Sequence, residues 1–456
     1  MTGHSGRTLG TGASGPGIVH LGAGAFARAH TWWATALAVD ADPGPWGVTA
    51  VAQRSHAVID ALLARDWRYD VRLLGPDEDS TDTVAVVRDG LVAADEPDRL
   101  MQALSAPETR IVTVTATEEA YPTTSTGTLD ARNQLVAADL RGDAPPRSLV
   151  GQVVAAAALR QERGAPPLSV LVCDNVQRGG EVLRQLATQL AEERGLGDAV
   201  AELARWRFPT SVVDRVVPAV EPEQQPDVVA DPAFRWVLQD DFAGPRPAWE
   251  RAGVQIVHDA EPWQLGKLLL VNAPHSLVAY LGLALGHTSV GEAMGDDVVS
   301  EAVGAALADE LVPCVPAAAG LDPGAEAAAT VRRFTRQVLP HALKQVGAAG
   351  STKLPQRLRF PLDRHRVRET AGTWSTLTIA LWVHALDRAL VEDSCADRVR
   401  ASIGSSPAQR AIDVIDLLGL GSAEADPARD GLAGWLTELD GGGPEAVRGA
   451  VVAATR

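Results

Sequence analysis

The sequence predicts an α/β N-terminal domain built on a parallel sheet, followed by a mostly α-helical C-terminal domain. In the first half of the chain, short apolar and β-branched segments alternate with helical segments, which is typical of a parallel sheet covered by helices. From about residue 261 onward, Ala- and Leu-rich segments with helical spacing replace them. With 456 residues and 46% hydrophobic content, the chain is long enough to form a separate core in each domain.

The composition argues against several classes of function. A formal net charge of -17 disfavours a nucleic acid or an anionic membrane as the partner and favours a small-molecule ligand. Cys173, Cys314 and Cys395 are odd in number and far apart, so they predict neither a disulfide framework nor a zinc site. No segment has the character of a signal peptide or reaches the roughly 18 uncharged apolar residues of a membrane helix. We therefore expect a cytoplasmic protein that binds neither nucleic acid nor membrane.

Four apolar segments are expected to form strands of the parallel sheet: residues 17–21, 47–52, 110–115 and 168–173. Residues 1–16, which precede them, are expected to form a flexible leader, and the Pro-rich residues 218–251 are expected to connect the two domains. Ligands bind at the carboxyl ends of the strands in open α/β sheets. Polar residues that follow strands, near Thr117 and Asn175, are therefore candidate site residues.

A glycine-rich turn follows the first predicted strand and opens a helix. Gly22, Gly24 and Ala27 fit the G-x-G-x-x-G/A pattern of a dinucleotide-binding loop, and Ala25 and Phe26 complete it. In that pattern the first glycine permits the tight turn, the second lets main-chain N–H groups approach a pyrophosphate, and the small third residue lets the helix lie close to the sheet. Glycine turns also join strands to helices for packing alone, so the motif by itself leaves both interpretations open.

The residues after the second predicted strand bear on the choice of cofactor. NAD sites usually place an acid there to accept a hydrogen bond from the ribose 2′-hydroxyl, whereas this chain has Gln53, Arg54 and Ser55. Arg54 could meet the 2′-phosphate of NADP, or it could be a solvated surface residue. NAD and NADP therefore both remain open.

Polar residues interrupt an otherwise apolar segment, EPWQLGKLLLVNAPHSLVAYLG, at residues 261–282. Lys267, Asn272 and His275 must find partners or a cavity in such surroundings, and one continuous helix would place all three within an arc of about 140°. Pro274 is expected to kink this helix, or to end it so that a new helix begins with Asn272 or its neighbour as the cap.

A lysine in apolar surroundings can act as a general base. Burial lowers the pKa of an amine, and a fall from about 10.4 towards about 7 or 8 costs the fold about 4 kcal/mol. Lys267 with such a pKa can take a hydroxyl proton while hydride leaves the same carbon. In the alternative interpretation, Lys267 extends to the surface and Asn272 only caps a helix.

Five segments occur in order along the chain: HLGAGAFARAH at residues 20–30, TVTATEEAY at 113–121, VCDNVQRGG at 172–180, FPTSVVDRVVP at 208–218 and KLLLVNAPHSLVAYLG at 267–282. They resemble the mannitol dehydrogenase family of polyol-specific long-chain dehydrogenases, which includes mannitol 2-dehydrogenase and the fructuronate and tagaturonate reductases. The resemblance extends from about residue 17 to at least residue 360. It implies a dinucleotide-binding Rossmann-type domain at residues 17–255 and a helical substrate-binding domain at residues 256–456. NAD is the usual cofactor of the family, and no metal is required.

The resemblance also implies roles for individual residues. It makes Lys267 the general base, with Asn175 and Asn272 donating hydrogen bonds to the alkoxide or carbonyl oxygen and His275 orienting substrate hydroxyls. Further substrate contacts are expected from Asp214, Lys353 and Arg357. Cofactor contacts are expected from the glycine loop and the ends of two strands, namely Gly22, Gly24, Ala25, Phe26, Arg54, Thr117 and Glu118.

The chain departs from the family pattern at several positions. Gln264 stands where an acid, three residues before the lysine, would relay the proton of Lys267 to solvent, and a neutral amide cannot do so. Pro274 precedes the histidine, where glycine or a small polar residue is usual, and Glu118 and Glu119 replace a commoner Glu-Lys or Glu-Gly pair. These departures affect the expected substrate more than the expected chemistry.

Three functions are compatible with these features. The first is metal-independent hydride transfer between NAD(P) and a linear polyol or its ketose, and the second is reduction of a keto-uronate such as fructuronate. The uronate requires a cation facing its carboxylate, for which Lys353 and Arg357 are the candidates. The third is a non-catalytic dinucleotide-binding sensor, against which the presence of Lys267 counts. By analogy with the family, we expect a monomer or a weak homo-oligomer.

Overall fold

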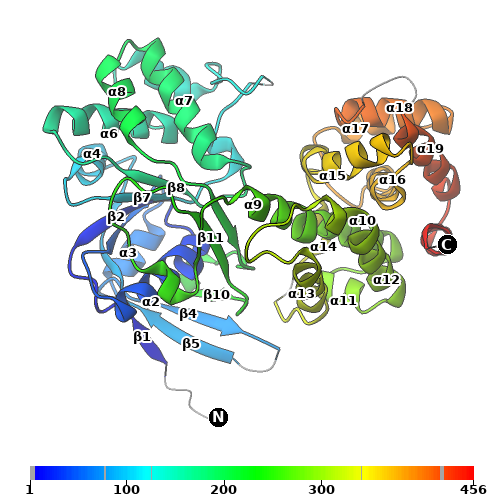
Figure 1. Cartoon of the computed structure of the whole chain (residues 1–456), viewed down its shortest axis with the longest axis horizontal. Helices are drawn as coiled ribbons and strands as arrows, with labels where there is room; N and C mark the ends of the chain where they lie inside the picture. Colours follow the sequence, from blue (N-terminus) through cyan, green and yellow to red (C-terminus); the bar gives the residue numbers. More distant parts are fainter. Residues whose placement is uncertain (1–5, 77–78, 125, 340, 422–425, 456) are drawn as a thin grey trace. The chain divides into compact units, whose positions relative to one another are not determined.

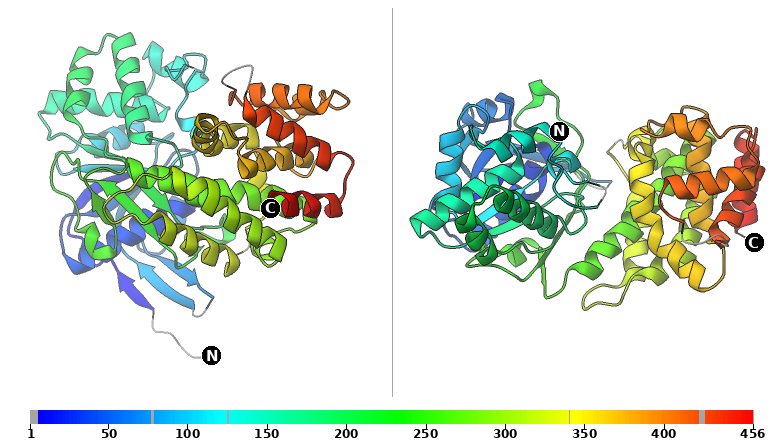
Figure 2. Two further views of the ribbon diagram at one scale, coloured as in Figure 1. Left: turned by 45° about the vertical axis from the view of Figure 1, so that its right-hand side comes forward. Right: turned by 90° about the horizontal axis from the view of Figure 1, so that it is seen from above.

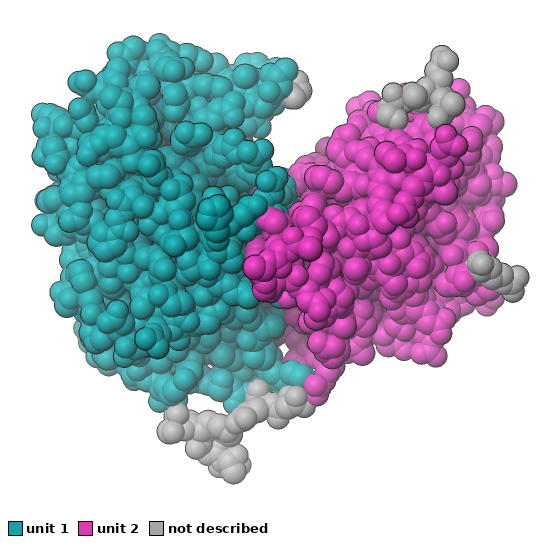
Figure 3. Space-filling model, in the orientation of Figure 1, with its two compact units in different colours: residues 1–261 teal, residues 262–456 magenta. Residues whose placement is uncertain are grey.

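The computed structural model describes residues 6–76, 79–124, 126–339, 341–421 and 426–455 (Figure 1). The chain divides into two compact units, Met1–Glu261 and Pro262–Arg456, coloured teal and magenta in Figure 3. Unit 1 contains the predicted parallel sheet, and no strand occurs among the described residues of unit 2. The predicted order of an α/β domain and a helical domain is therefore confirmed. The division after residue 261 lies close to the predicted boundary at residue 255.

Unit 1 is built on a five-stranded sheet with the order β6-β3-β2-β7-β8, in which all neighbours are parallel. Its strands are β2 (Pro16–Leu21), β3 (Gly47–Ala52), β6 (Val87–Val92), β7 (Ile111–Val114) and β8 (Ser169–Val172). Four of them coincide with the apolar segments identified in the sequence, because strands covered on both faces are apolar without alternation. The chain leaves β2 towards β3 on one side and later returns to β7 on the other. The carboxyl end of β2 therefore marks the crevice where ligands bind in such sheets.

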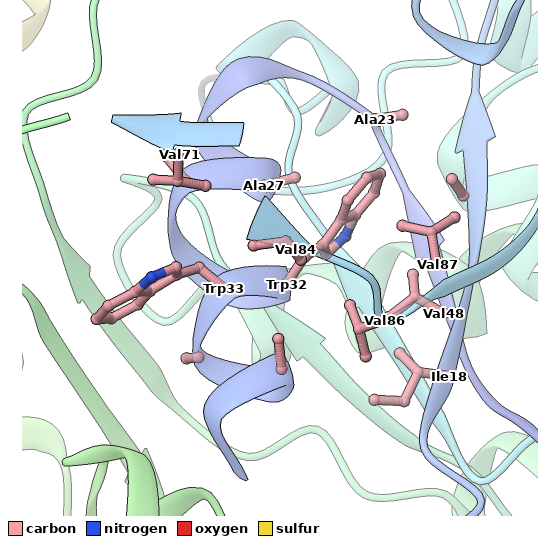
Figure 4. Packing of buried hydrophobic residues seen from close by; sticks show 14 of the residues in the cluster. Ile18, Ala23, Ala27, Trp32, Trp33, Val48, Val71, Val84, Val86 and Val87 are labelled. Atoms are coloured by element: carbon pink, nitrogen blue, oxygen red, sulfur yellow. The ribbon is translucent and has the colours of Figure 1, made fainter. Parts of the chain in front are cut away.

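Helices cover both faces of this sheet. They are α1 (Ala25–Ala27), η1 (Arg28–Trp32), α2 (Trp33–Ala41), α3 (Ala57–Leu63), α4 (Pro97–Ser105), η2 (Glu118–Ala120), α5 (Gln134–Arg141), α6 (Leu149–Arg163), α7 (Gly179–Glu193) and α8 (Gly197–Arg205). Alternate strand residues enter two separate cores. Ile18 and Val48 pack with Trp32 on one face (Figure 4), whereas Val19 and Val112 pack under α4, α6, α7 and α8 on the other.

A second sheet contains an ordered strand within the predicted flexible leader. Its order is β1-β5-β4-β10, with β1 (Arg7–Leu9), β5 (Asp79–Val84), β4 (Tyr69–Leu74) and β10 (Val228–Ala230). Arg7 donates two hydrogen bonds of 3.0 Å to the Asp82 carboxylate, which fixes β1 beside β5. The prediction of a flexible segment over residues 1–16 is therefore wrong for this strand. Its Gly-rich surroundings gave no signal, because main-chain hydrogen bonds hold an edge strand.

A third sheet corrects the predicted connection between the domains. Its order is β12-β11-β9, with β9 (Ser211–Asp214), β11 (Arg235–Gln239) and β12 (Gln255–Val257), and two 3-10 turns, η3 (Pro222–Gln224) and η4 (Trp249–Ala252), lie between the strands. The Pro-rich residues 218–251 thus belong to unit 1 and contribute β10 and β11. Trp236 and Trp249 are fully buried there, and the Trp249 indole donates a 3.0 Å hydrogen bond to the Thr35 hydroxyl of α2. The prolines mark turns between short strands.

Unit 2 is helical (Figure 2). Its helices are α9 (Glu261–Lys267), η5 (Leu268–Asn272), α10 (Ala273–Leu285), α11 (Val290–Met294), α12 (Asp297–Ala306), η6 (Leu307–Leu311), η7 (Val312–Cys314), α13 (Pro323–Thr335), α14 (Leu343–Gly347), α15 (Gly350–Val367), α16 (Thr373–Asp387), α17 (Ala396–Arg400), α18 (Pro407–Leu417), α19 (Pro427–Leu439) and α20 (Pro444–Ala454). α9, η5 and α10 form one continuous helix, Glu261–Leu285. Among the described residues, this helix alone has the length and composition to cross a membrane, but 83% of its apolar window is buried inside the structure, as in a core helix.

Candidate active site

The glycine turn after β2 has the geometry that a dinucleotide-binding loop needs. Gly22 has a φ angle of +106°, and a Cβ atom there would lie 1.9 Å from the main-chain oxygen of Thr115, so glycine is required. At Gly24, an added Cβ atom would have no neighbour closer than 4.0 Å, so the space over this residue is open. Open main chain at the start of a helix fits the pyrophosphate of a dinucleotide.

Buried contacts hold the helix that follows this turn. Ala27 is fully buried, as expected for a helix that lies close to the sheet. The Arg28 guanidinium donates to the carbonyl oxygens of Gly24, at 3.2 Å, and Pro226. The Tyr69 hydroxyl donates to the carbonyl oxygen of Arg28 at 2.9 Å. Burial lowers the pKa of Arg28 to about 10. Arg28 therefore fixes the main chain of the glycine loop, a role that no sequence motif indicated.

A cleft of about 750 Å³ lies at the carboxyl ends of β2, β3 and β7. Three predicted cofactor contacts, Gly22, Arg54 and Thr117, line this cleft. Arg147 and Gln152 line it as well, and the sequence analysis missed both. They lie just before α6 and in its first turn, far along the chain from the glycine loop, and no motif connects them to it.

The remaining predicted cofactor contacts lie beside the cleft. Ala25 and Phe26 are half-buried in the first turn of the helix after the glycine loop, and the Phe26 ring stacks on the His30 ring at 4.8 Å. Glu118 is exposed and begins η2, directly after Thr117. Their roles in cofactor binding stay predictions.

A half-buried carboxyl group joins the segments that follow β7 and β8. Asp174 accepts a 2.6 Å hydrogen bond from the N–H of Ala116 and a second one from the hydroxyl of Tyr121. Asn175, the predicted oxygen-binding residue, comes next in the chain and is exposed. The Asp174 carboxyl group therefore fixes the main chain that carries Asn175 against the segment that carries Thr117. The sequence analysis missed both Asp174 and Tyr121.

The ionisation of Asp174 should make the stability of unit 1 depend on pH. Burial raises the pKa of Asp174 to about 7, against the hydrogen bonds from Tyr121 and Ala116 that favour the charged form. The pKa of Asp174 in the folded state exceeds the unfolded value of about 3.9, so the folded protein holds this proton more tightly than the unfolded chain. The stability that the protonated Asp174 contributes is therefore fully present below about pH 4 and is lost as the pH rises through about 7. We expect Asp174→Asn to gain unfolding free energy relative to the wild type between about pH 5 and about pH 8. Urea denaturation across this range measures it, and parallel pH profiles for the two proteins would contradict it.

Asp214 and its neighbour occupy different environments in unit 1. Asp214 ends β9, is half-buried, and lies opposite Arg235 of β11 in the strand register. Arg215 is buried and donates to the main-chain oxygens of Asp231, at 2.9 Å, and Ala29, at 2.6 Å. Arg215 is therefore a structural residue, whereas the predicted role of Asp214 stays a prediction.

A π-helical turn lies between two predicted catalytic residues of unit 2. Lys267 ends α9 and Asn272 ends the π-helical turn η5, so the turn separates them. The N–H of Ala273 donates to the carbonyl of Leu268, five residues back, and the helix continues through Pro274. The predicted alternative in which the helix ends and restarts here is therefore wrong. Such turns inside α-helices occur often at functional sites.

Lysine is rare in this chain. It occurs only as Lys267, Lys344 and Lys353, so that 38 of the 41 Lys and Arg residues are arginine. A guanidinium group keeps its proton in proteins, so of the two basic side chains lysine and arginine only lysine can act as a base. The choice of lysine at residue 267 in so arginine-rich a chain is a signal that the sequence analysis did not use.

Basic side chains gather around His275 in unit 2. The His275 ring lies 4.0 Å from the ring of Phe334 and 5.5 Å from that of His341. Burial is the main cause that lowers the pKa of His341, and the nearby positive charges of Arg333 and Lys353 lower it further. The sequence predicted His275 and Lys353 as site residues but missed Arg333 and His341.

Lys353 and Arg357 lie one turn apart on α15. The Lys353 ammonium donates to the carbonyl oxygen of Val346 at 3.3 Å, and the Arg357 guanidinium donates to the hydroxyl of Ser276 at 2.7 Å. Ser276 directly follows His275. We define the basic cluster as His275, Arg333, His341, Lys353 and Arg357. The structure thus joins three predicted substrate-binding residues to two unpredicted ones within unit 2, while Asn175 and Asp214 belong to unit 1.

Comparisons with known proteins identify the family. The mannitol dehydrogenase Rossmann domain model matches residues 16–251, and the mannitol dehydrogenase C-terminal domain model matches residues 259–400. The chain belongs to the mannitol dehydrogenase family. This mannitol dehydrogenase homologue is therefore an NAD(P)-dependent oxidoreductase, and its Rossmann domain binds NAD(P).

Individual relatives cover most of the chain. D-mannonate oxidoreductase from Escherichia coli (strain K12) is 30% identical over 421 residues, which are 88% of this chain and 82% of that protein. Mannitol 2-dehydrogenase from Pyrenophora tritici-repentis is 30% identical over 418 residues, which are 86% of this chain and 74% of that protein. The ternary complex of Pseudomonas fluorescens mannitol 2-dehydrogenase with NAD and D-mannitol matches with a TM-score of 0.85 and 25% identity, over 98% of this chain and 96% of that chain. Among the described residues of this mannitol dehydrogenase homologue, no three His, Cys, Asp or Glu side chains are grouped as a metal site.

Proposed function

We propose that this mannitol dehydrogenase homologue interconverts a keto-uronate, which is a linear sugar acid with a ketone, and the corresponding secondary alcohol. The basic cluster carries the proposal. A uronate has a terminal carboxylate where a ketose has a hydroxymethyl group. Lys353, Arg357 and Arg333 supply ammonium and guanidinium donors of the kind that bind carboxylates. The relative named D-mannonate oxidoreductase supports a sugar acid as the substrate.

The magnitude of the charge effect favours the acid over a neutral sugar. A hydrogen bond between a charged donor and a carboxylate contributes about 1.5–3 kcal/mol, against about 0.5–1.5 kcal/mol for a neutral pair. Arg357 donates a hydrogen bond to Ser276, the residue after His275, and Lys353 lies one turn earlier on the same helix as Arg357. Both cations can therefore act on one end of a substrate that His275 orients.

The proposed chemistry assigns each residue one task. The bound cofactor supplies hydride to the ketone carbon, or accepts it in the reverse direction. Lys267 donates the proton to the developing alkoxide during reduction and takes it back during oxidation. Asn272 donates an N–H group to this oxygen, which stabilises its negative charge. The reaction needs no metal, because these donors stabilise the oxyanion.

A linear polyol and its ketose form the second candidate substrate pair. The ternary complex with NAD and D-mannitol at 25% identity and the mannitol 2-dehydrogenase relative favour it. Lys353 and Arg357 can also donate hydrogen bonds to hydroxyl groups. The test is the rate of NAD(P)H oxidation with fructuronate, tagaturonate and fructose, and of its formation with mannonate and mannitol. We expect the highest kcat/KM with a sugar acid. A higher value with fructose or mannitol would make the polyol the substrate, and no reaction with any of them would refute both proposed substrate pairs.

Removing the two α15 cations should change the preference between these substrates. We expect Lys353→Ala combined with Arg357→Ala to lower kcat/KM for the keto-uronate by at least about tenfold, because one charged hydrogen bond alone is worth that much. The loss for fructose should be smaller, so the ratio of the two values is the measurement. Lys344→Ala, which removes an exposed lysine of the same unit, serves as the control. An unchanged ratio in the double variant would rule out a carboxylate at these residues.

We further propose that the protein works in the cytoplasm as a monomer or weak homo-oligomer, with no nucleic acid or membrane partner. The net charge of -17 disfavours a nucleic acid or an anionic membrane as a partner, and the burial of the Glu261–Leu285 helix supports its role as a core element. Sedimentation across a range of concentrations tests the oligomeric state. A stable higher oligomer at low concentration would contradict it.

A further inference from the structure

We propose that the cleft of unit 1 selects NADP(H) over NAD(H), with Arg54 and Arg147 binding the 2′-phosphate that distinguishes the two dinucleotides. The inference deepens the proposed function, because it takes the cleft as the cofactor site of that reaction. It concerns the adenosine end of the dinucleotide alone. The proposed roles of Lys267 and the proposed substrate can therefore be refuted while this inference holds, and the reverse is also true.

A neutral amide pair occupies the end of β3. Gln53, the first residue after this strand, forms two hydrogen bonds with Gln152 of α6. The amide nitrogen of Gln53 donates to the amide oxygen of Gln152 at 3.2 Å, and the amide nitrogen of Gln152 donates to the amide oxygen of Gln53 at 3.0 Å. A carboxylate at this point would accept from a ribose 2′-hydroxyl and would repel a 2′-phosphate. The amide pair carries no charge, so it removes the feature that selects NAD and leaves room for an anion.

Two guanidinium groups line the cleft, one at the end of β3 and one just before α6, which are the two elements that the amide pair connects. Arg54 follows Gln53 at the end of β3, and Arg147 precedes α6, on which Gln152 lies. The carboxylate of Asp139 accepts hydrogen bonds from the N–H groups of Arg147 and Ser148, both at 3.0 Å, and from the Ser148 hydroxyl at 2.5 Å. The main chain of Arg147 is therefore fixed, while its side chain is exposed at the cleft wall.

Two acids, Asp95 and Glu119, also line the cleft. The Asp95 carboxylate lies 2.7 Å from the imidazole of His56, which forms an ion pair with it when protonated. Glu119 lies in η2 after β7, and β7 is on the opposite side of β2 from β3. A guanidinium group carries a positive charge at physiological pH.

The charge arrangement predicts a measurable difference between the two dinucleotides. A phosphate group carries up to two negative charges and accepts paired hydrogen bonds from guanidinium groups. Each charge-assisted hydrogen bond of about 1.5–3 kcal/mol corresponds to roughly a 10- to 100-fold change in Kd. The 2′-hydroxyl of NAD offers no charge to either arginine.

The test uses binding, which does not depend on turnover. Calorimetric titration of the purified full chain with 2′,5′-ADP and with 5′-AMP isolates the 2′-phosphate, and titration with NADPH and NADH repeats the comparison. We expect 2′,5′-ADP to bind at least about tenfold more tightly than 5′-AMP, with a preference that weakens as salt is added. Equal affinities for the two nucleotides would overturn the inference.

Variants assign the preference to the named residues. Arg54→Ala combined with Arg147→Ala should bring the affinity for 2′,5′-ADP down to that for 5′-AMP and leave the latter almost unchanged. Arg141→Ala, which removes an exposed arginine of α5 outside the cleft lining, is the matched control. Gln53→Glu should weaken 2′,5′-ADP binding by introducing charge repulsion. A preference that survives in the double variant would refute the role of these arginines, even if the enzyme turns over as proposed.

Discussion

Lys267→Ala is expected to lower kcat by about 10²- to 10⁴-fold, which is the usual contribution of a positioned general acid or base. Lys267 ends α9, directly before the π-helical turn, on the helix that also carries Asn272 and His275. Without its amine, the developing alkoxide has no positioned proton donor during reduction. Steady-state rates of NAD(P)H oxidation measure the loss, and calorimetric titration with the cofactor should show unchanged affinity, because the glycine loop belongs to unit 1.

Two further variants separate the charge of Lys267 from its ability to exchange a proton. Lys267→Arg keeps the positive charge but cannot act as a base, so we expect it to be almost as inactive as the alanine variant. Lys344→Ala removes an exposed lysine of the same unit and should keep full activity. Activity near the wild-type level in the Lys267→Arg variant would show that charge suffices and would remove the lysine from its role as the base.

Gly22→Ala is expected to destabilise unit 1 strongly, whether or not cofactor is present. A non-glycine residue in a sparsely populated region of φ and ψ costs about 1–3 kcal/mol, and Gly22 has a φ angle of +106°. The new Cβ atom would also lie 1.9 Å from the Thr115 carbonyl oxygen, so the main chain directly after β7 would have to move. Thermal unfolding of the cofactor-free protein measures the effect as a fall in Tm.

Gly24→Ala is the matched variant for this prediction. Its Cβ atom would meet nothing closer than 4.0 Å, so the Tm of the cofactor-free protein should stay near that of the wild type. The same methyl group would occupy the open space over the loop, and we expect weaker binding of NADP(H) and NAD(H) alike. Wild-type affinity in Gly24→Ala would mean that the pyrophosphate does not lie over this residue.

The sequence predicted the central elements of the fold because their signals are local. β2, β3, β7 and β8 are apolar on both faces, and their segments are visible as continuous runs of β-branched and apolar residues. β1, β10 and β11 were missed, since short strands in Gly- and Pro-rich segments are held by main-chain pairing. That pairing depends on partners far away in the chain, such as Asp82 for Arg7.

The candidate site also contains residues that local patterns predicted and residues that they could not predict. The glycine loop and Lys267 lie in segments with recognisable patterns, whereas Arg147, Gln152 and His341 enter the site through packing between distant segments. No motif or periodicity in the sequence indicates a contact between two distant residues such as Gln53 and Gln152. A helix that continues through Pro274 was one of two predicted alternatives, but the π-helical turn directly before the proline was not predicted.

The proposed reaction is metal-independent hydride transfer to the ketone of a linear sugar acid, with Lys267 as the proton donor. The most direct measurement is the reduction of fructuronate by chelator-treated protein with NADPH deuterated at the transferred position, followed by mass and NMR analysis of the product. We expect one deuterium on the new carbinol carbon, at a rate that the chelator does not change. A product without deuterium at that carbon, or a rate that is lost on chelation and restored by added zinc, would contradict the account.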